Sequence, residues 1–259
     1  MRLLLDIGNT RIKWAVQTEQ GLDEQQAIAH AGLSAAQLGT QVFAPSGQVS
    51  QLLVSNVAGS AMAEQVRQAA RDCWQLEPQF VVATATANVA GRILRNAYAE
   101  PAKLGSDRWL ALLAACALQP GAALVVSAGT ALTLDALTAQ GQHLGGMIAP
   151  GPDLMMSSLM QRTSDIAIRA EQGRQGNEFF ADNTLGCVYQ GSVQAAVALI
   201  ESAHARINTT TGGVRLLLTG GAVALLQQHL SLPVQVVPDL VLQGLAAYGQ
   251  RSDIVAPSQ

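Results

Sequence analysis

The chain has 259 residues, of which 49% are hydrophobic and 13% are charged, so it contains enough apolar sequence for a folded core and is unlike a disordered segment. Its formal net charge of −3 gives no basic field for nucleic acid or for an anionic membrane surface, and we expect a small-molecule partner. Its 3 cysteines are scattered, which argues against a disulfide framework or a zinc knuckle and favours a reducing cytoplasm.

The sequence predicts neither membrane insertion nor a metal centre built from histidines. The first leucine run is interrupted at Asp6, too early for a signal peptide, and the longest apolar stretch, residues 109–118, is too short to cross a bilayer. No HExxH motif occurs, and the histidines are far apart, so we expect them at the surface or at helix ends. They are His30, His143, His204 and His229.

The N-terminal residues 2–16 predict two strands joined by a tight turn. In the second strand the alternation of apolar and polar residues places Lys13 on the face opposite Trp14. Asp6 ends the first apolar run, where an ionised carboxylate costs free energy unless hydrogen bonds or an ion compensate it. Asp6 therefore either closes its own turn or meets a ligand.

Further strands and a helix are predicted in the next hundred residues. Apolar runs at 51–57 and 80–84 predict two strands. A helix is predicted from about Ser106 to Leu118, with Ser106 as its N-cap and the Pro-Gly pair at 120–121 as its stop.

The segment 122–137 resembles the N-terminal strand, turn and strand. Both contain an apolar run, a small polar residue, a glycine and a threonine, followed by an alternating strand. With one gap, the overlay pairs Asp6 with Ser127, Gly8 with Gly129 and Thr10 with Thr130. This weak repeat indicates two related halves joined near residue 120.

The remaining sequence continues to alternate between helical and strand patterns. Residues 145–160 predict a Gly/Pro turn leading into a helix, and a long helix is predicted after Asn183 or Thr184, either of which can cap it. Residues 214–230 predict a strand, a Thr-Gly-Gly turn and a helix, and residues 233–250 a last strand and helix, with fraying expected over 249–259. Alternation throughout predicts the α/β class.

Two glycine turns are the features most suited to phosphate. The chain has no P-loop, no G-x-G fingerprint and no G-x-S-x-G elbow. The turns DIGNT and SAGT could direct backbone amides at phosphate oxygens and, facing each other, grip a polyphosphate. Asn9, Thr10 and Thr130 would add side-chain donors, Lys13 a point charge and Asp6 an oxygen for Mg²⁺. Either turn alone is better explained as a simple hairpin.

Several motifs together resemble type III pantothenate kinases, of the acetate and sugar kinase, Hsp70 and actin superfamily. They are DIGNTRIKW, YAEPAKLGSDRW, SAGTALTLD, GGMIAPG, NTLG and TGG, in this order and at this chain length, and LGSDRW preceded by Tyr98 is the most specific. The resemblance covers nearly the whole chain. It implies two ribonuclease-H-like domains with a cleft between them, at 1–120 and 121–259, with the last helix packing back on the first domain.

The resemblance also implies roles for residues that match the family's motifs. Asp107 matches the general base for the pantothenate hydroxyl, and Arg108 would bind substrate or neutralise developing charge. The first phosphate motif comprises Asp6, Gly8, Asn9, Thr10 and Lys13. The residues that match ATP contacts are Gly129 and Thr130, and those that match the adenosine motif are Thr219, Gly220 and Gly221. The residues that match pantothenate contacts are Tyr98, Gly105, Ser106 and Thr184. Asp107 in a first helical turn beside Arg108 stays ionised, although an ordinary ion pair explains that segment alone equally well.

One residue departs from the family pattern. Ser127 occupies the position of an Asp that binds an activating monovalent cation, K⁺ or NH₄⁺, and it offers one neutral oxygen in place of a carboxylate. We therefore expect weak dependence on K⁺ at most. Asp135 also lies near this turn and is a candidate substitute for the missing carboxylate, although we favour its interpretation as a solvated carboxylate at a strand end.

The implied activity is ATP-dependent phosphorylation of pantothenate to 4′-phosphopantothenate, the first step of coenzyme A synthesis, with Mg²⁺. The resemblance further implies a homodimer, with helix 109–118 as a candidate contact. The scattered cysteines favour the cytoplasm, and the net charge favours neither a nucleic-acid nor a membrane partner. Two alternatives remain. A non-catalytic regulatory protein on the same fold is favoured by Ser127 alone, and an actin-like or chaperone-like ATPase needs more chain than is present.

Overall fold

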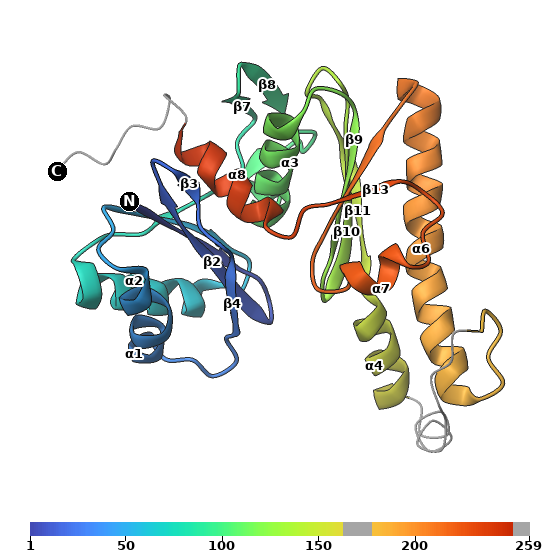
Figure 1. The fold of residues 1–259 in the computed structure, drawn as a ribbon, viewed down its shortest axis with the longest axis horizontal. Coiled ribbons are helices and arrows are strands. Elements are labelled where there is room, and N and C mark those ends of the chain that lie inside the picture. The colour runs from blue at the N-terminus through green and yellow to red at the C-terminus, as the bar shows by residue number, and fades with distance from the viewer. Residues whose placement is uncertain (163–177, 251–259) are drawn as a thin grey trace. The chain divides into compact units, whose positions relative to one another are not determined.

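The computed structural model describes residues 1–162 and 178–250, which form two compact units (Figure 1). Of the described residues, the first unit comprises 1–120, 140–143 and 239–250, and the second comprises 121–139, 144–162 and 178–238. Each unit is described by itself below.

The first unit is built on a mixed sheet whose strands follow the order β3-β2-β1-β5-β6, with β4 also paired to β2. β1 runs antiparallel to β2 and parallel to β5, and β5 runs parallel to β6. The strands are β1 (Arg2–Ile7), β2 (Arg11–Thr18), β3 (Gly21–Leu22), β4 (Gln26–Ala29), β5 (Gln51–Asn56) and β6 (Gln79–Phe80), and a separate hairpin pairs β7 (Thr86–Val89) with β8 (Arg92–Arg95).

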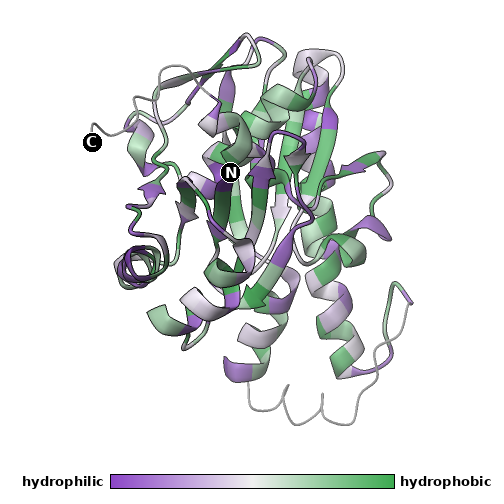
Figure 2. Ribbon diagram, turned by 60° about the vertical axis from the view of Figure 1, so that its left-hand side comes forward, coloured by the Kyte–Doolittle hydropathy of each residue, from purple (hydrophilic) through white to green (hydrophobic). Residues whose placement is uncertain are grey.

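Helices cover both faces of this sheet because β1 and its neighbours are apolar on both. One face, with Leu5, Trp14 and Val54, packs on the α1 and α2 region, as Figure 1 shows, and Figure 2 shows apolar residues in green along the strands. α8 contacts β1 and β5 and packs closely on α3. The helices are α1 (Ala35–Leu38), η1 (Gly39–Phe43), η2 (Ala44–Ser46), α2 (Ser60–Trp74), η3 (Pro101–Lys103), α3 (Ser106–Leu118) and α8 (Leu240–Gly249).

The α3 and α8 pair is held closer than side chains normally allow. A side chain on Gly244 of α8 would overlap the carbonyl group of Leu110 in α3, so only glycine fits there. Trp109 and Leu110 are fully buried within this unit. The expectation that helix 109–118 lies against a partner subunit is therefore wrong, because the chain's own helix and strands cover it.

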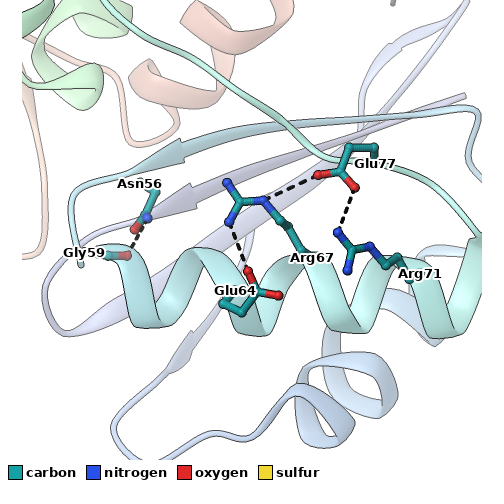
Figure 3. A network of polar contacts seen from close by, with 6 residues as sticks. All are labelled: Asn56, Gly59, Glu64, Arg67, Arg71 and Glu77. Carbon is teal, nitrogen blue, oxygen red and sulfur yellow. Dashed lines mark hydrogen bonds and ion pairs between the residues drawn. The ribbon is translucent and has the colours of Figure 1, made fainter.

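The outer face of α2 carries a network of charged side chains (Figure 3). The Arg67 Nη1 lies 3.3 Å from the Glu64 Oε2, and the Arg67 Nε lies 3.4 Å from the Glu77 Oε1. The Arg71 Nη2 lies 3.4 Å from the Glu77 Oε2. The Arg67 guanidinium also lies 4.9 Å from the centroid of the Phe80 ring. Exposed ion pairs of this kind contribute little to stability, so we interpret the network as the solvated face of the helix.

The second unit repeats the strand order of the first, β11-β10-β9-β12-β13, with β9 antiparallel to β10 and parallel to β12. Its elements are β9 (Ala123–Ala128), β10 (Ala131–Leu137), β11 (His143–Pro150), α4 (Pro152–Arg162), α6 (Thr184–Thr211), β12 (Arg215–Thr219), α7 (Val223–Gln227) and β13 (Val234–Val236). α6 covers one face, where Val126, Leu134 and Leu218 join Val193 and Ile200 in the core. The predicted α/β class with two ribonuclease-H-like sheets is confirmed.

Three local predictions are wrong. Residues 80–84 are not a strand, since β6 ends at Phe80, and residues 145–150 form most of β11 rather than a turn. The N-cap of α3 is Gly105, without a side-chain hydrogen bond, while Ser106 begins the helix. The predicted cap of α6 is confirmed for Asn183, whose Oδ1 accepts from the Gly186 N–H at 2.9 Å.

Most of the C-terminal stretch expected to fray lies outside the described residues. Cys73, Cys116 and Cys187 are free, in agreement with their scattered positions. Among the helices of residues 1–162 and 178–250, none combines the length and hydrophobicity needed to cross a bilayer.

Candidate active site

The first part of the candidate site is the turn between β1 and β2. Gly8 donates its N–H to the Arg11 carbonyl at 3.0 Å, which closes the turn, while Asn9 and Thr10 are exposed at its tip. Beside it, the Val57 N–H donates to the Ile7 carbonyl at 3.0 Å, which ties the turn to the end of β5. Because β1 and β5 are parallel, their carboxyl ends meet at this edge of the sheet.

A row of polar side chains crosses the sheet directly below the turn. Asp6 pairs in register with Lys13 on β2 and with Ser55 on β5, so all three side chains project from the same face. The prediction that Lys13 points away from the apolar face is confirmed. Ser55 is fully buried, and its Oγ lies 3.1 Å from the Oγ of Ser106, which links β5 to the first turn of α3.

Asp6 lies in surroundings that disfavour its ionised form. Its Oδ1 is enclosed and has no hydrogen-bond partner. Burial and the nearby charge of Asp107 raise the pKa of Asp6 to about 7, against the opposing effects of Lys13 and of a hydrogen bond from Ser55. A desolvated carboxylate oxygen without a donor is suited to a cation, so the structure favours the ligand interpretation of Asp6 over a self-closed turn.

The start of α3 brings the Asp107 carboxylate and the Arg108 guanidinium close to the Tyr98 ring. The Asp107 Oδ1 accepts the Arg108 N–H at 2.8 Å, which fixes the carboxylate in the first helical turn. Arg108 is buried, and its Nη1 donates to the Tyr98 Oη at 2.9 Å, with the guanidinium 5.8 Å from the ring centroid. A side chain on Gly105 would approach the Asp107 Oδ1 to 2.7 Å, so glycine here keeps the space beside that oxygen open.

The sequence did not indicate that His30 supports the phosphate turn. Its Nε2 lies 2.8 Å from the Gly8 carbonyl oxygen and must donate to it, and its backbone N–H donates to the Thr10 carbonyl at 3.2 Å. His30 directly follows β4, a short strand that no local pattern identified. Only the pairing of β4 with β2 brings it to the turn.

The corresponding edge of the second unit gathers three glycine turns. The Gly129 N–H donates to the Ala131 carbonyl at 3.0 Å, as Gly8 does to Arg11, and the Gly151 N–H donates to the Thr130 carbonyl at 2.9 Å. Gly220 has φ +105°, and a side chain there would collide with Ala128. At this edge Gly129, Thr130 and Gly221 are exposed, while Gly151 is buried.

Ser127 lies in a row that contains hydroxyl groups. It pairs in register with Thr133 on β10 and with Thr219 on β12, which places the three on one face of the sheet. The Thr219 Oγ1 donates to the Pro238 carbonyl at 3.2 Å. Asp135 projects from the same face and is only 2% exposed, so its interpretation as a solvated carboxylate is wrong.

The predicted site residues thus fall into two sets. The first unit brings together Asp6, Gly8, Asn9, Thr10, Lys13, Tyr98, Gly105, Ser106, Asp107 and Arg108. The second unit gathers Ser127, Gly129, Thr130, Thr219, Gly220 and Gly221 at one sheet edge, while Thr184 begins α6. No cluster of three or more His, Cys, Asp or Glu side chains suited to a metal occurs in the part of the chain that the structure describes.

Comparison with known structures supports the fold. A protein from Campylobacter jejuni assigned as a Baf family transcriptional activator is 21% identical, covers 94% of this chain and 95% of its own, and has a TM-score of 0.57. A protein from Sinorhizobium meliloti assigned as a 2-dehydro-3-deoxygalactonokinase is 13% identical, covers 96% of this chain and 98% of its own, and has a TM-score of 0.58. At these identities the likeness concerns the fold alone.

Relatives found by sequence have a higher identity to this chain than these structures. A type III pantothenate kinase of Aromatoleum aromaticum is 39% identical over 256 residues, which cover 99% of this chain and 100% of the relative. A type III pantothenate kinase of Nitrosospira multiformis is 36% identical over 257 residues, which cover 98% of this chain and 93% of the relative. The type III pantothenate kinase family matches residues 2–206. The chain therefore belongs to the type III pantothenate kinase family.

Proposed function

We propose that this protein acts in the cytoplasm and transfers the γ-phosphoryl group of ATP to the hydroxyl of pantothenate, giving 4′-phosphopantothenate in the first step of coenzyme A synthesis. The observation that carries the proposal is the arrangement at the start of α3. There an Asp107 carboxylate, held by a backbone hydrogen bond, lies close enough to the phosphate turn to raise the pKa of Asp6. An acceptor side and a phosphate side therefore meet within one unit.

Asp107 is proposed to take the proton of the attacking hydroxyl. Phosphoryl transfer requires mainly positioning and charge neutralisation, with a carboxylate that accepts this proton. The hydrogen bond from the Arg108 N–H keeps Asp107 oriented, and the N-terminal end of α3 favours negative charge at this position. Arg108, fixed by Tyr98, is proposed to bind the substrate and to neutralise developing charge.

The turn after β1 is proposed to hold the phosphates. The amides of residues 9 and 10 at the tip of the turn and the charge of Lys13 are suited to phosphate oxygens, and the unpartnered Oδ1 of Asp6 is suited to Mg²⁺. When bound, Mg²⁺ neutralises charge on the phosphates. In the second unit, the backbone of Gly129, Thr130 and the 219–221 turn is proposed to contact ATP.

The proposal is tested by measuring ADP release from Mg²⁺·ATP with and without pantothenate. We expect release that depends on pantothenate and a product carrying one phosphate on the pantothenate hydroxyl. ADP release that is independent of pantothenate would indicate an ATPase. Binding of both compounds without turnover would instead favour the regulatory alternative.

We propose that Ser127 leaves the reaction nearly indifferent to the monovalent cation. The groups beside it in register are the neutral hydroxyls of Thr133 and Thr219. The carboxylate on the same face of β10, Asp135, lies two residues beyond Thr133 and farther from the turn, so the position of Ser127 itself offers K⁺ no carboxylate. Turnover should agree within about twofold between K⁺ and Na⁺ buffers, and Ser127→Asp should introduce K⁺ activation of about tenfold, since hard cations bind oxygen sites of higher charge more tightly. Steep activation of the unmodified protein by K⁺ would contradict this.

We further propose that the protein is a homodimer. Support comes from large apolar side chains exposed on the edge strand β11 and on α4: Leu144, Met147, Ile148, Leu154 and Leu159. Exposed apolar groups gathered on neighbouring elements are typical of interaction surfaces. Light scattering at micromolar concentration should give twice the 27.0 kDa chain mass. The mass of a single chain would refute the dimer.

A further inference from the structure

His143 is a buried polar residue to which the proposed mechanism gives no role. It begins β11 and is 0% exposed, so its expected place at the surface or at a helix end is wrong. Its Nδ1 accepts the Ala97 N–H at 3.4 Å. The Nδ1 atom thus serves as an acceptor for the backbone of this segment.

The segment that His143 contacts carries Tyr98 and is fixed at several points. Asn96 donates from Nδ2 to the carbonyl groups of Thr84 and Pro101, each at 3.2 Å, and its Oδ1 accepts the Tyr98 N–H at 3.0 Å. Between these two anchored residues, the Ala97 N–H is directed to His143. The backbone of the segment is thus held from one side by Asn96 and from the other by His143.

The His143 ring also contacts the side chain of Tyr98. The two rings are nearly parallel, with an interplanar angle of 13° and centroids 6.4 Å apart. A tyrosine ring held this way has its hydroxyl in one place, and there it accepts a hydrogen bond from the Arg108 Nη1 at 2.9 Å. His143, Tyr98 and Arg108 therefore form a continuous set of contacts that ends beside Asp107.

We propose that His143 is a positioning residue for the pantothenate side of the site, which it serves by fixing Tyr98 and, through it, Arg108. This inference rests on the proposed function and assigns His143 no contact with substrate. Side chains that orient others are as necessary as those that touch the ligand, because small displacements of a binding group weaken it strongly. The phosphate turn is not part of this set of contacts, so ATP should be affected little.

The test compares His143→Leu with His143→Asn in the full chain. Leucine and asparagine are similar in shape, but only asparagine has an oxygen that can accept the Ala97 N–H. We expect His143→Leu to raise the KM for pantothenate about ten- to hundredfold with the KM for ATP changed less than about twofold, and His143→Asn to restore at least half of the loss on a logarithmic scale. In a Tyr98→Phe background the effect of His143→Leu should shrink, because the two residues act in series.

Thermal unfolding of each variant accompanies the kinetics. An unchanged KM for pantothenate in folded His143→Leu would overturn the inference while leaving the proposed function intact. Equal changes in both KM values, or a loss of activity that follows thermal stability and that asparagine does not rescue, would show a purely structural role and would also overturn it. If the unmodified protein does not phosphorylate pantothenate, the proposed function fails and this inference fails with it.

Discussion

Asp107→Asn is expected to lower the turnover of pantothenate phosphorylation by roughly 10²- to 10⁴-fold, the usual effect of losing a general base. The amide cannot take the hydroxyl proton, but its Oδ1 can still accept the Arg108 N–H that Asp107 accepts at 2.8 Å. The start of α3 should therefore persist, and the variant should unfold at a temperature no lower than the unmodified protein. Steady-state kinetics at saturating ATP and pantothenate measure the effect.

A control separates loss of the base from loss of any negative charge. Asp72→Asn makes the same chemical change on exposed α2, where Asp72 only accepts a hydrogen bond from Gln68, and it should leave turnover unchanged. Binding of ATP by Asp107→Asn should also persist, because the phosphate turn does not include this residue. Turnover within about threefold of the unmodified protein would remove Asp107 from the proposed mechanism.

The parts of the fold that could be predicted from sequence are those with a local cause. Both strand-turn-strand segments follow from alternating residues around a glycine, and the overlay of Asp6 on Ser127 agrees with equivalent positions in two sheets of equal strand order. The extent of α3 was also predictable, because an apolar run ends at a Pro-Gly stop. These motifs lie at the corresponding sheet edges of the two units.

Three of the failures involve contacts between distant segments. Ser106 resembles an N-cap, but its hydroxyl meets Ser55, 51 residues earlier, which no local pattern reveals. The glycines and proline of β11 predicted a turn, yet pairing with β10 extends them as an edge strand, where both residue types are tolerated. His143 is a third case, since the residues that it contacts, Ala97 and Tyr98, come from another part of the chain.

Replacement of Asp6 is expected to have the second large effect, a loss of activity together with a gain in stability. Burial and Asp107 raise its pKa from an ordinary 3.8 to about 7 in the folded chain. Between these two values the folded state holds a proton that the unfolded state has released, so the free energy of unfolding falls as pH rises and is constant above about pH 7. The full loss is about 4 kcal/mol at most, since each pKa unit corresponds to about 1.4 kcal/mol and Asp6 retains some exposed surface.

Asp6→Asn removes this ionisation, so we expect the ligand-free variant to be more stable than the unmodified protein by about 1–4 kcal/mol at about pH 8, with a smaller gain at about pH 5. Turnover should nevertheless fall at least about a hundredfold, because the carboxylate proposed for Mg²⁺ is lost. Urea unfolding at both pH values measures the stability. Asp107→Asn is the matched control for the stability measurement, because it removes the neighbouring charge that raises the pKa of Asp6 but keeps the Asp6 carboxylate, and it should give a smaller gain. A variant that is less stable than the unmodified protein at pH 8, or as active as it, would mean that Asp6 serves to close its turn. A variant that is more stable and inactive is the result expected for a carboxylate that is retained because it binds the ligand.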